Sequence, residues 1–391
     1  MSEPLAGIRV IDLTSAVLGP VATQILGDMG AEVLKIEPPP GDPARLLGPS
    51  RHPGMGAYFL NINRNKKSVV LDLKRPAARQ ALLRLAETAD IFDHNMRLAA
   101  AERLGVNYAA VASRNPRIVY AAATGYRKDG VHRDRPSFDD VIQGESGLAA
   151  LNGGPGGEPR HVPMAVCDKI CGYVLASAIG MALFHRERTG EGQEVHVPML
   201  ETVVAFNLVD HLWHGVLAEP EKGLGYPRML TPHRRPFPTK DGHICILATT
   251  DAQSRHLFEA LDCPELADEE RFCTLDRRTD NIDELYALIV ERMRRRTTAE
   301  WRERLDHFDV HNGVVTNLGG LLADRYLTES GFFEPVEHPS EGKMLTTAIP
   351  VAFSATPGEC FRLPPPRLGE HTREVLAGLG YSDADIEKIN A

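Results

Sequence analysis

The first 125 residues constrain the fold most, because short apolar segments alternate there with amphipathic ones. The apolar segments are nearly continuous, whereas the others repeat apolar residues at helical spacing. Apolar strands that alternate with helices are typical of a parallel sheet covered on both faces. The pattern therefore predicts an α/β fold. The expected strands cover 7–13, 31–37, 67–73, 90–95 and 117–126, and the expected helices cover 21–30, 76–89 and 99–106.

The loop after the first strand lacks the glycine pattern of a dinucleotide site. Its sequence, TSAVLGPVATQ at 14–24, contains no GxGxxG motif, although many nucleotide-binding domains share the predicted architecture. An NAD-linked oxidoreductase therefore stays only as an alternative. A second glycine-rich stretch, GGPGGEPR at 153–160, is typical of a flexible connector.

Composition changes near residue 220, so we expect two domains in this chain of 391 residues. Before the change, 170–188 predicts a buried helix, and 200–218 predicts an apolar helix suited to a linker or a subunit interface. After it, we expect a strand at 243–247, a helix over 282–296, and a helix opened by a Thr297…Glu300 capping box.

From about residue 335 the chain returns to strand and loop, including 348–357. The expected boundaries are 1–202 for the first part of a large domain, 203–225 for a linker helix, 226–325 for a small α+β domain, and 326–391 for a linker and the return to the large domain.

Charge and composition disfavour several classes of protein. The net charge of −9 argues against non-specific binding to nucleic acid. The N-terminus does not resemble a secretory signal, and no apolar run approaches the roughly 20 residues that cross a bilayer. We therefore expect a cytoplasmic protein without membrane contact. The six cysteines are scattered, which favours buried thiols over disulfides or a metal site.

Asp168 lies where an apolar segment ends and the predicted helix of 170–188 begins. An aspartate at this position is most simply a helix N-cap, which accepts hydrogen bonds from first-turn amides and stays ionised. A carboxylate that is held in this way and shielded from water can also attack an activated acyl carbon. The local pattern leaves both interpretations open.

Longer motifs connect Asp168 to a known family. The run from Asp168 to Glu201, which includes RERTGEGQEVHVPMLE, resembles the signature of the class III CoA-transferases of CaiB/BaiF type. This family includes formyl-CoA transferase, the carnitine CoA-transferases and α-methylacyl-CoA racemase. Further matches span nearly the whole chain in the right order: VIDLTSAVLGP, GAEVLKIEPPPGD, NRNKKSVVLDLK, RPSFDDVIQGESGL and PRLGEHTREVL.

The resemblance implies a Rossmann-like large domain built from both ends of the chain, a small inserted domain, and an interlocked homodimer. It also implies that Asp168 attacks the thioester of an acyl-CoA and that CoA passes to a free carboxylic acid. Acyl-CoA and this acid are then the partners. Because a thioester already stores the required energy, neither a metal ion nor a permanently bound cofactor is expected.

Other site positions are carried over from the resemblance one by one. The positions that match the CoA groove are Ala16, Leu71, Lys74, Asn95, Met96, Ala100 and Arg103, and those that match the acyl pocket are Val17, Tyr58, Phe138 and Asp139. Lys74 and Arg103 suit phosphate groups. Without the resemblance, these two cations would be solvated surface residues, Tyr58 a core residue and Asp139 a second helix cap.

Several alternatives stay open within the resemblance. A racemase needs a second proton carrier, but Phe138 stands where the racemase branch has a histidine, which favours transfer. A non-catalytic CoA-binding protein is a further alternative. The sequence does not identify the acids, although Val17 replaces a glutamine of formyl-CoA transferase, which argues against oxalate. The run His233-Arg234-Arg235 is either solvated surface or a clamp for a carboxylate.

Overall fold

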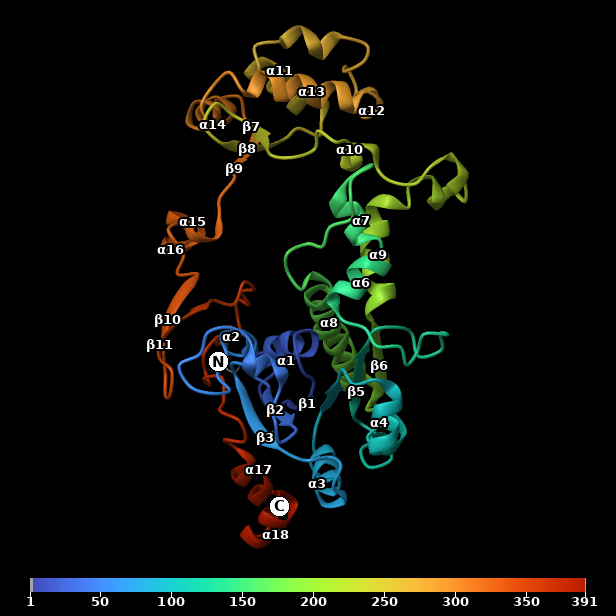
Figure 1. The fold of residues 1–391 in the computed structure, drawn as a ribbon, viewed down its shortest axis with the longest axis vertical. Coiled ribbons are helices and arrows are strands. Elements are labelled where there is room, and N and C mark those ends of the chain that lie inside the picture. The colour runs from blue at the N-terminus through green and yellow to red at the C-terminus, as the bar shows by residue number, and fades with distance from the viewer. Residues whose placement is uncertain (1–2, 391) are drawn as a thin grey trace. The chain divides into compact units, whose positions relative to one another are not determined.

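The computed structural model describes residues 3–390, and these form two compact units (Figure 1). Unit 1 contains residues 3–146, 162–205 and 326–390, and unit 2 contains 147–161 and 206–325. The sequence analysis assigned 147–161 to the large domain, whereas its contacts group it with unit 2.

Unit 1 is built on six parallel strands in the order β3-β2-β1-β4-β5-β6. This is the Rossmann strand order, with its reversal between β1 and β4. The prediction of an α/β fold with a parallel sheet is confirmed. The strands are β1 (Arg9–Leu13), β2 (Glu32–Glu37), β3 (Lys66–Val70), β4 (Ile91–His94), β5 (Val119–Thr124) and β6 (Gln193–Pro198).

One face of this sheet carries the main apolar core of unit 1. Ile11, Leu34 and Phe92 point from the strands toward helices that include the C-terminal pair α17 and α18. Figure 1 shows this pair beside β3 and α3, far along the chain from the strands that it covers. The helices of this face are α3 (Pro76–Ala86), α4 (Leu98–Leu104), α5 (Tyr108–Ala112), α17 (Thr372–Gly378) and α18 (Asp383–Asn390).

The opposite side of the sheet packs against α1 (Leu18–Asp28) and α8 (Val166–Thr189). These two helices approach closely at Gly172, where a Cβ atom would lie 2.7 Å from the carbonyl oxygen of Leu18. A side chain there would collide with backbone, so glycine permits this packing.

Helix α8 bears on two predictions from the sequence, one about membrane-spanning segments and one about burial. Its 24 residues, with a mean hydropathy of 1.5 in the most apolar window, make it the one helix among the described residues that could cross a bilayer by length and composition. That evidence is weak, because core helices pass the same test. Nor is it buried on every side, since Tyr173, Met181 and Phe184 are exposed in this single chain.

Unit 2 contains a three-stranded antiparallel sheet in the order β7-β8-β9, which packs with its helices around Phe258, Ile289 and Trp301. The predicted capping box between Thr297 and Glu300 is present. The elements are α7 (Leu148–Gly153), η2 (Trp213–Leu217), η3 (Pro220–Lys222), α10 (Pro227–Leu230), β7 (Phe237–Pro238), β8 (His243–Leu247), α11 (Asp251–Ala260), η4 (Pro264–Asp268), α12 (Leu275–Asp280), α13 (Ile282–Met293), α14 (Thr298–His307), β9 (His311–Val314) and α15 (Leu318–Leu322).

Two further predictions need correction. The apolar helix expected over 200–218 ends at His211 as α9 (Met199–His211), and η2 follows it. The segment 348–357 forms no strand; two prolines interrupt it, and the pairing strands lie earlier as the hairpin β10 (Phe333–His338) and β11 (Gly342–Thr347). The remaining elements are η1 (Pro43–Leu46), α2 (Ala57–Ile62), α6 (Asp139–Glu145) and α16 (Arg325–Glu329).

Candidate active site

A cavity of about 220 Å³ opens in unit 1 at the carboxyl ends of β1, β4, β5 and β6. In open parallel sheets, ligands bind at this edge, beside the point where the strand order reverses. Asp168 lies in its wall. The residues that line the cavity are Ser15, Ala16, Val17, Leu18, Asn95, Arg97, Ala123, Thr124, Gly125, Arg133, Arg135, Pro136, Ser137, Phe138, Asp168 and Met199.

Asp168 does not act as the N-cap predicted from the sequence. Helix α8 begins two residues earlier, with Ala165 as N-cap, so Asp168 lies inside the first turn. The backbone N–H of Asp168 donates to Oδ1 of Asp139 at 2.9 Å. A carboxylate from α6 therefore satisfies this first-turn amide. Within residues 3–390, no hydrogen bond occupies the carboxylate oxygens of Asp168, which leaves them available for chemistry.

The electrostatic environment of Asp168 also differs from the prediction that it stays ionised. Burial, and next the negative charge of Asp139, raise the pKa of Asp168 to about 7. Burial and the charges of Asp168 and Asp139 likewise raise the pKa of the half-buried Tyr58. The structure thus brings the predicted residues Tyr58, Asp139 and Asp168 into electrostatic contact. The raised pKa reflects a carboxylate that is already partly desolvated, and such a group is more reactive once it is ionised.

Asp139 is itself held in place. It is only 7 % exposed, and Nε2 of the fully buried Gln143 donates to its Oδ2 at 2.6 Å. The backbone N–H of Val162, which precedes α8, donates to Oε1 of Gln143 at 2.8 Å. This chain of hydrogen bonds ties α6 to the segment that leads into α8, and so it fixes the position of Asp168.

The loop after β1 forms the cavity wall with an unusual backbone. Ala16 has φ +63°, the left-handed region that costs a non-glycine residue about 1–2 kcal/mol. Its N–H donates to Oδ1 of Asp42 at 3.1 Å, and Oδ2 of Asp42 lies 2.8 Å from Nζ of Lys35 in a fully buried ion pair. Lys35 Nζ also donates to the carbonyl oxygen of Thr14. The pair therefore braces both ends of this bend, which places Ala16 and Val17 in the cavity wall.

Asn95, predicted to contact CoA, binds this same loop. Its Oδ1 accepts from the N–H of Ser15 at 3.0 Å, and its Nδ2 donates to the carbonyl oxygen of Ser15 at 2.8 Å. These bonds connect the loops after β1 and β4 across the reversal point of the sheet. Because its amide is used in this way, Asn95 mainly shapes the cavity.

The other predicted CoA residues differ in their access to solvent. Leu71 is 1 % exposed in the core of unit 1, so its side chain cannot reach a ligand. Met96 packs partly against the same core. Lys74 and Arg103 are exposed, and no ion pair engages either cation within the described chain, whereas Ala100 on α4 is half-buried. Both cations are therefore accessible to a phosphate group.

Three cavity arginines were missed by the sequence analysis. Arg97 is exposed after β4, Arg133 pairs with Glu102 and Asp134, and Arg135 pairs with Glu145 at 2.7 Å. Arg133 and Arg135 lie in the charged loop before α6, a composition that resembles ordinary surface, so only the folded chain identifies them. Phe138, which is 74 % exposed, adds an apolar side to the mouth of the cavity.

The cysteines add no thiolate to this site, although Cys167 adjoins Asp168 in the chain. Cys167, Cys171, Cys263 and Cys360 are buried as predicted, but Cys245 is exposed on β8 and Cys273 is half-buried. Burial raises the pKa of Cys167 and of Cys171 to about 12, so neither is a thiolate at neutral pH. Within residues 3–390, no group of three His, Cys, Asp or Glu side chains is arranged to hold a metal ion.

Comparison with known proteins gives consistent matches over the whole length. The model of CoA-transferase family III matches residues 5–372. Succinyl-CoA:glutarate CoA-transferase of Homo sapiens is 31 % identical, with 99 % of this chain and 89 % of that protein covered. Probable fatty acyl-CoA transferase Rv3272 of Mycobacterium tuberculosis is 34 % identical, with 96 % and 98 % covered.

Solved structures agree with these matches. A crystal structure of Rv3272 has a TM-score of 0.81 and 32 % sequence identity, with 95 % of this chain and 99 % of that chain covered. A CAIB/BAIF family protein from Brucella suis has a TM-score of 0.79 at 28 % identity, with 97 % and 100 % covered.

Proposed function

Because the chain belongs to CoA-transferase family III, we propose that it moves CoA from an acyl-CoA to a free carboxylic acid, with Asp168 as the nucleophile. One observation carries this proposal. Asp168 lies in the cavity wall with its backbone N–H bonded to Asp139 and its own carboxylate oxygens without a hydrogen bond in the described chain. This is the state in which a carboxylate can attack an acyl carbon.

The reaction then proceeds through covalent intermediates on Asp168. A carboxylate oxygen attacks the thioester carbonyl, the C–S bond breaks, and CoA leaves as thiolate, which gives a mixed anhydride. The thiolate attacks the aspartyl carbonyl, releases the first acid and forms an aspartyl-CoA thioester. The acceptor acid attacks this thioester, the C–S bond breaks, and CoA thiolate leaves, which gives a second anhydride. The thiolate then attacks the carbonyl carbon that came from the acceptor acid. A new acyl-CoA forms and the Asp168 carboxylate is regenerated.

The surroundings of Asp168 support these steps. Removal of water from the carboxylate strengthens its attack, and the positive end of the 24-residue helix α8 offsets part of the cost of its charge. Lys74 and Arg103 are proposed to bind the CoA phosphates, together with Arg97. Phe138 cannot carry a proton, which favours transfer over racemisation.

The acids and the assembly are further parts of the proposal. The name of the human relative specifies succinyl-CoA and glutarate, so short dicarboxylic acids are the first donors and acceptors to test, beside fatty acyl-CoA. We also propose an interlocked homodimer that covers the exposed apolar side chains of α8.

A trapping experiment tests the nucleophile. Incubation with succinyl-CoA, and in parallel with a fatty acyl-CoA, in the presence of hydroxylamine is expected to convert Asp168 to a hydroxamate, visible as a mass change in one peptide. Asp168→Asn is expected to abolish both this label and CoA transfer. A folded Asp168→Asn variant with wild-type turnover would refute the proposal. Incorporation of solvent deuterium at the α-carbon of a 2-methylacyl-CoA, without an acceptor acid, would indicate the racemase instead.

A further inference from the structure

Unit 2 carries an open groove of about 550 Å³ that the proposed chemistry at Asp168 does not use. It lies over the antiparallel sheet, between the segment before β7 and the strand β9. No aspartate or glutamate lines it. The lining residues are Arg234, Arg235, Pro236, Phe237, Cys245, Ile246, Leu247, Tyr286, His311, Asn312 and Gly313.

The two arginines of the groove have no partner in the part of the chain that the structure describes. Both are exposed, and no hydrogen bond or ion pair reaches either guanidinium group. The backbone that carries them is nevertheless fixed, because the N–H of Arg234 donates to the carbonyl oxygen of Thr231 at 3.1 Å, and the N–H of Arg235 donates to that of His233 at 2.9 Å. Two unneutralised cations are thus held side by side on an ordered turn.

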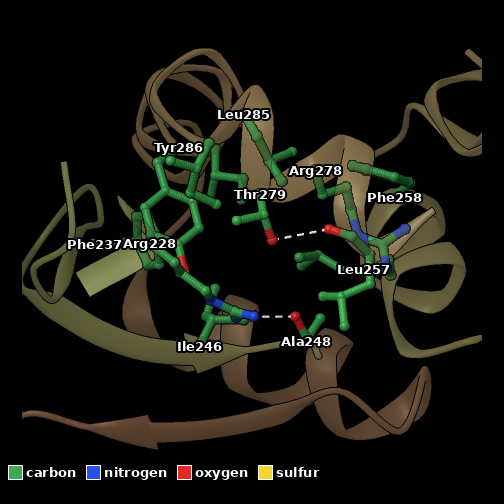
Figure 2. Close-up of a pocket in the computed structure, with 14 residues that line it drawn as sticks. Arg228, Phe237, Ile246, Ala248, Leu257, Phe258, Arg278, Thr279, Leu285 and Tyr286 are labelled. Atoms are coloured by element: carbon green, nitrogen blue, oxygen red, sulfur yellow. Dashed lines mark hydrogen bonds between the residues drawn. The ribbon is translucent and has the colours of Figure 1, made fainter. Parts of the chain in front are cut away.

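Two other arginines of unit 2, Arg228 and Arg278, do have hydrogen-bond partners. Arg228 and Arg278 line a separate cavity of about 20 Å³, which is room for about one water molecule (Figure 2). Nη2 of Arg228 donates to the carbonyl oxygen of Ala248 at 3.0 Å, and Nη2 of Arg278 donates to Asp251 at 2.6 Å. The buried arginines Arg228 and Arg278 thus have hydrogen-bond partners within the unit. The exposed Arg234 and Arg235 have none in the described chain, so their guanidinium groups can bind a ligand.

The base of the groove is apolar and firmly held. Phe237 and Tyr286 are 4 % and 7 % exposed and meet edge to face, with ring centroids 5.7 Å apart. Figure 2 shows both rings beside Arg228, whose Nε donates to the Tyr286 hydroxyl at 3.1 Å. An apolar base with cations at its rim matches a small organic anion, whose hydrocarbon part and charged end need different surroundings.

We infer that this groove binds the anionic group of a small organic ligand, with Arg234 and Arg235 as the charged contacts. Guanidinium groups bind carboxylate and phosphate through paired, charge-assisted hydrogen bonds. Building on the proposed function, two sources supply such a group: a carboxylate of the substrate acid, and a phosphate of CoA. Exposed His311 also lines the groove, and its ring N–H can donate a hydrogen bond to an anion.

Calorimetric titration of the full-length protein tests this site. The probes are glutarate, butyrate as a monocarboxylate of similar length, and adenosine 3′,5′-bisphosphate as the nucleotide end of CoA. The variant is Arg234→Ala/Arg235→Ala. The matched control is Arg294→Ala/Arg302→Ala, which removes two exposed arginines of the same unit that lie outside the groove and also lack a partner in the described chain.

The groove variant is expected to bind glutarate or the nucleotide at least about tenfold more weakly than the control variant does. Loss of glutarate binding alone identifies the acid as the ligand, and loss of nucleotide binding alone identifies the phosphate. Arg234→Lys/Arg235→Lys should retain part of the affinity, because it keeps the charge but not the paired geometry. Unchanged binding of both anionic probes in a folded groove variant would overturn the inference.

Binding by calorimetry does not depend on turnover. If the wild-type protein transfers no CoA but the groove variant still loses anion binding, the site exists and the proposed reaction is wrong. If CoA transfer proceeds and the groove variant changes neither binding nor the KM for the acid, the proposed reaction survives and the groove inference fails.

Discussion

At the scale of the residue, the site depends on two carboxylates with different tasks. Asp139 accepts the first-turn amide of α8, and this frees the side chain of Asp168 from the capping role that its position in the sequence suggested. The same proximity raises the pKa of Asp168, after the larger effect of burial. One contact thus both positions the proposed nucleophile and makes its ionised form less stable.

A pH profile measures this coupling. In the proposed reaction Asp168 attacks in its ionised form, so kcat/KM of the wild type is expected to rise with pH through about 7. Asp139→Asn removes the negative charge, which should lower the pKa of Asp168 and move this rise to lower pH. Asp140→Asn, which changes the exposed neighbour on α6, serves as control and should move it less. An unshifted profile in Asp139→Asn would show that Asp139 does not influence the nucleophile.

Stability should change in the opposite sense to activity. The folded pKa of Asp168 lies above its unfolded value, so its ionised form costs stability as pH rises from about 4 to about 7. At pH 8 the free energy of unfolding of Asp168→Asn is therefore expected to exceed that of the wild type by about 2–3 kcal/mol after allowance for solvent screening, so the variant should unfold at a higher temperature. The difference should shrink at pH 5. Thermal unfolding at both pH values measures it, and an equal or lower melting temperature at pH 8 contradicts this account.

The bend at Ala16 allows a paired test. Asp42→Ala leaves Lys35 buried without its closest partner, which is expected to cost about 3 kcal/mol and to raise the KM for acyl-CoA as the cavity wall relaxes. Ala16→Gly removes the left-handed strain and should cost nothing, unlike an ordinary change of alanine to glycine. Denaturant unfolding compares the two, and a loss above about 1 kcal/mol in Ala16→Gly would argue against strain at this residue.

At the scale of the element, α8 and α14 show how differently helix patterns translate into structure. The uniform apolar pattern of α8 suggested burial on all sides, yet only one side packs against α1 and the sheet. In α14 the Thr297–Glu300 box forms as predicted, because both partners lie within one turn and require no distant contact.

The cap of α14 gives a measurable stability effect. Thr297→Ala removes the side-chain acceptor for the N–H of Glu300 and is expected to cost about 1 kcal/mol in local stability. Hydrogen exchange of the α14 amides should accelerate accordingly. The amides of α11, which has its own capping box at Thr250, provide an internal control and should not change. Equal acceleration in both helices would mean that unit 2 as a whole was destabilised.

At the scale of the whole molecule, several large apolar side chains are exposed to solvent in the single chain. Tyr173, Met181 and Phe184 on α8 and Phe206 and Val209 on α9 are between 58 % and 85 % exposed in the single chain. An apolar surface of this kind is typical of a subunit interface. The interlocked homodimer stays a prediction, as does the cytoplasmic location.

Light scattering after size-exclusion chromatography tests the assembly. The wild type is expected to have twice the chain mass of 42.9 kDa. Val209→Asp places a charge on the proposed interface and should shift the protein toward monomer, whereas Val131→Asp, in an exposed loop at 97 % exposure, should not. A wild type that elutes as monomer at micromolar concentration would contradict the proposed dimer.

The sequence determined the features that depend on local or repeated patterns. Alternating apolar segments identified the parallel sheet, and the ordered family motifs predicted that Asp168, Tyr58 and Asp139 belong to one site. Strand and helix periodicity act over a few residues, and the family motifs preserve their order along the chain, so both can be read without a structure.

Only the tertiary structure decided which groups meet. Asp139 and Asp168 are 29 positions apart, and Ala16 and Asp42 belong to loops after different strands. Such pairings arise when parallel strands bring their carboxyl ends to one edge. The arginines of the cavity and of the groove likewise resemble ordinary surface in the sequence, because a charged side chain gains a function only from what the fold places beside it.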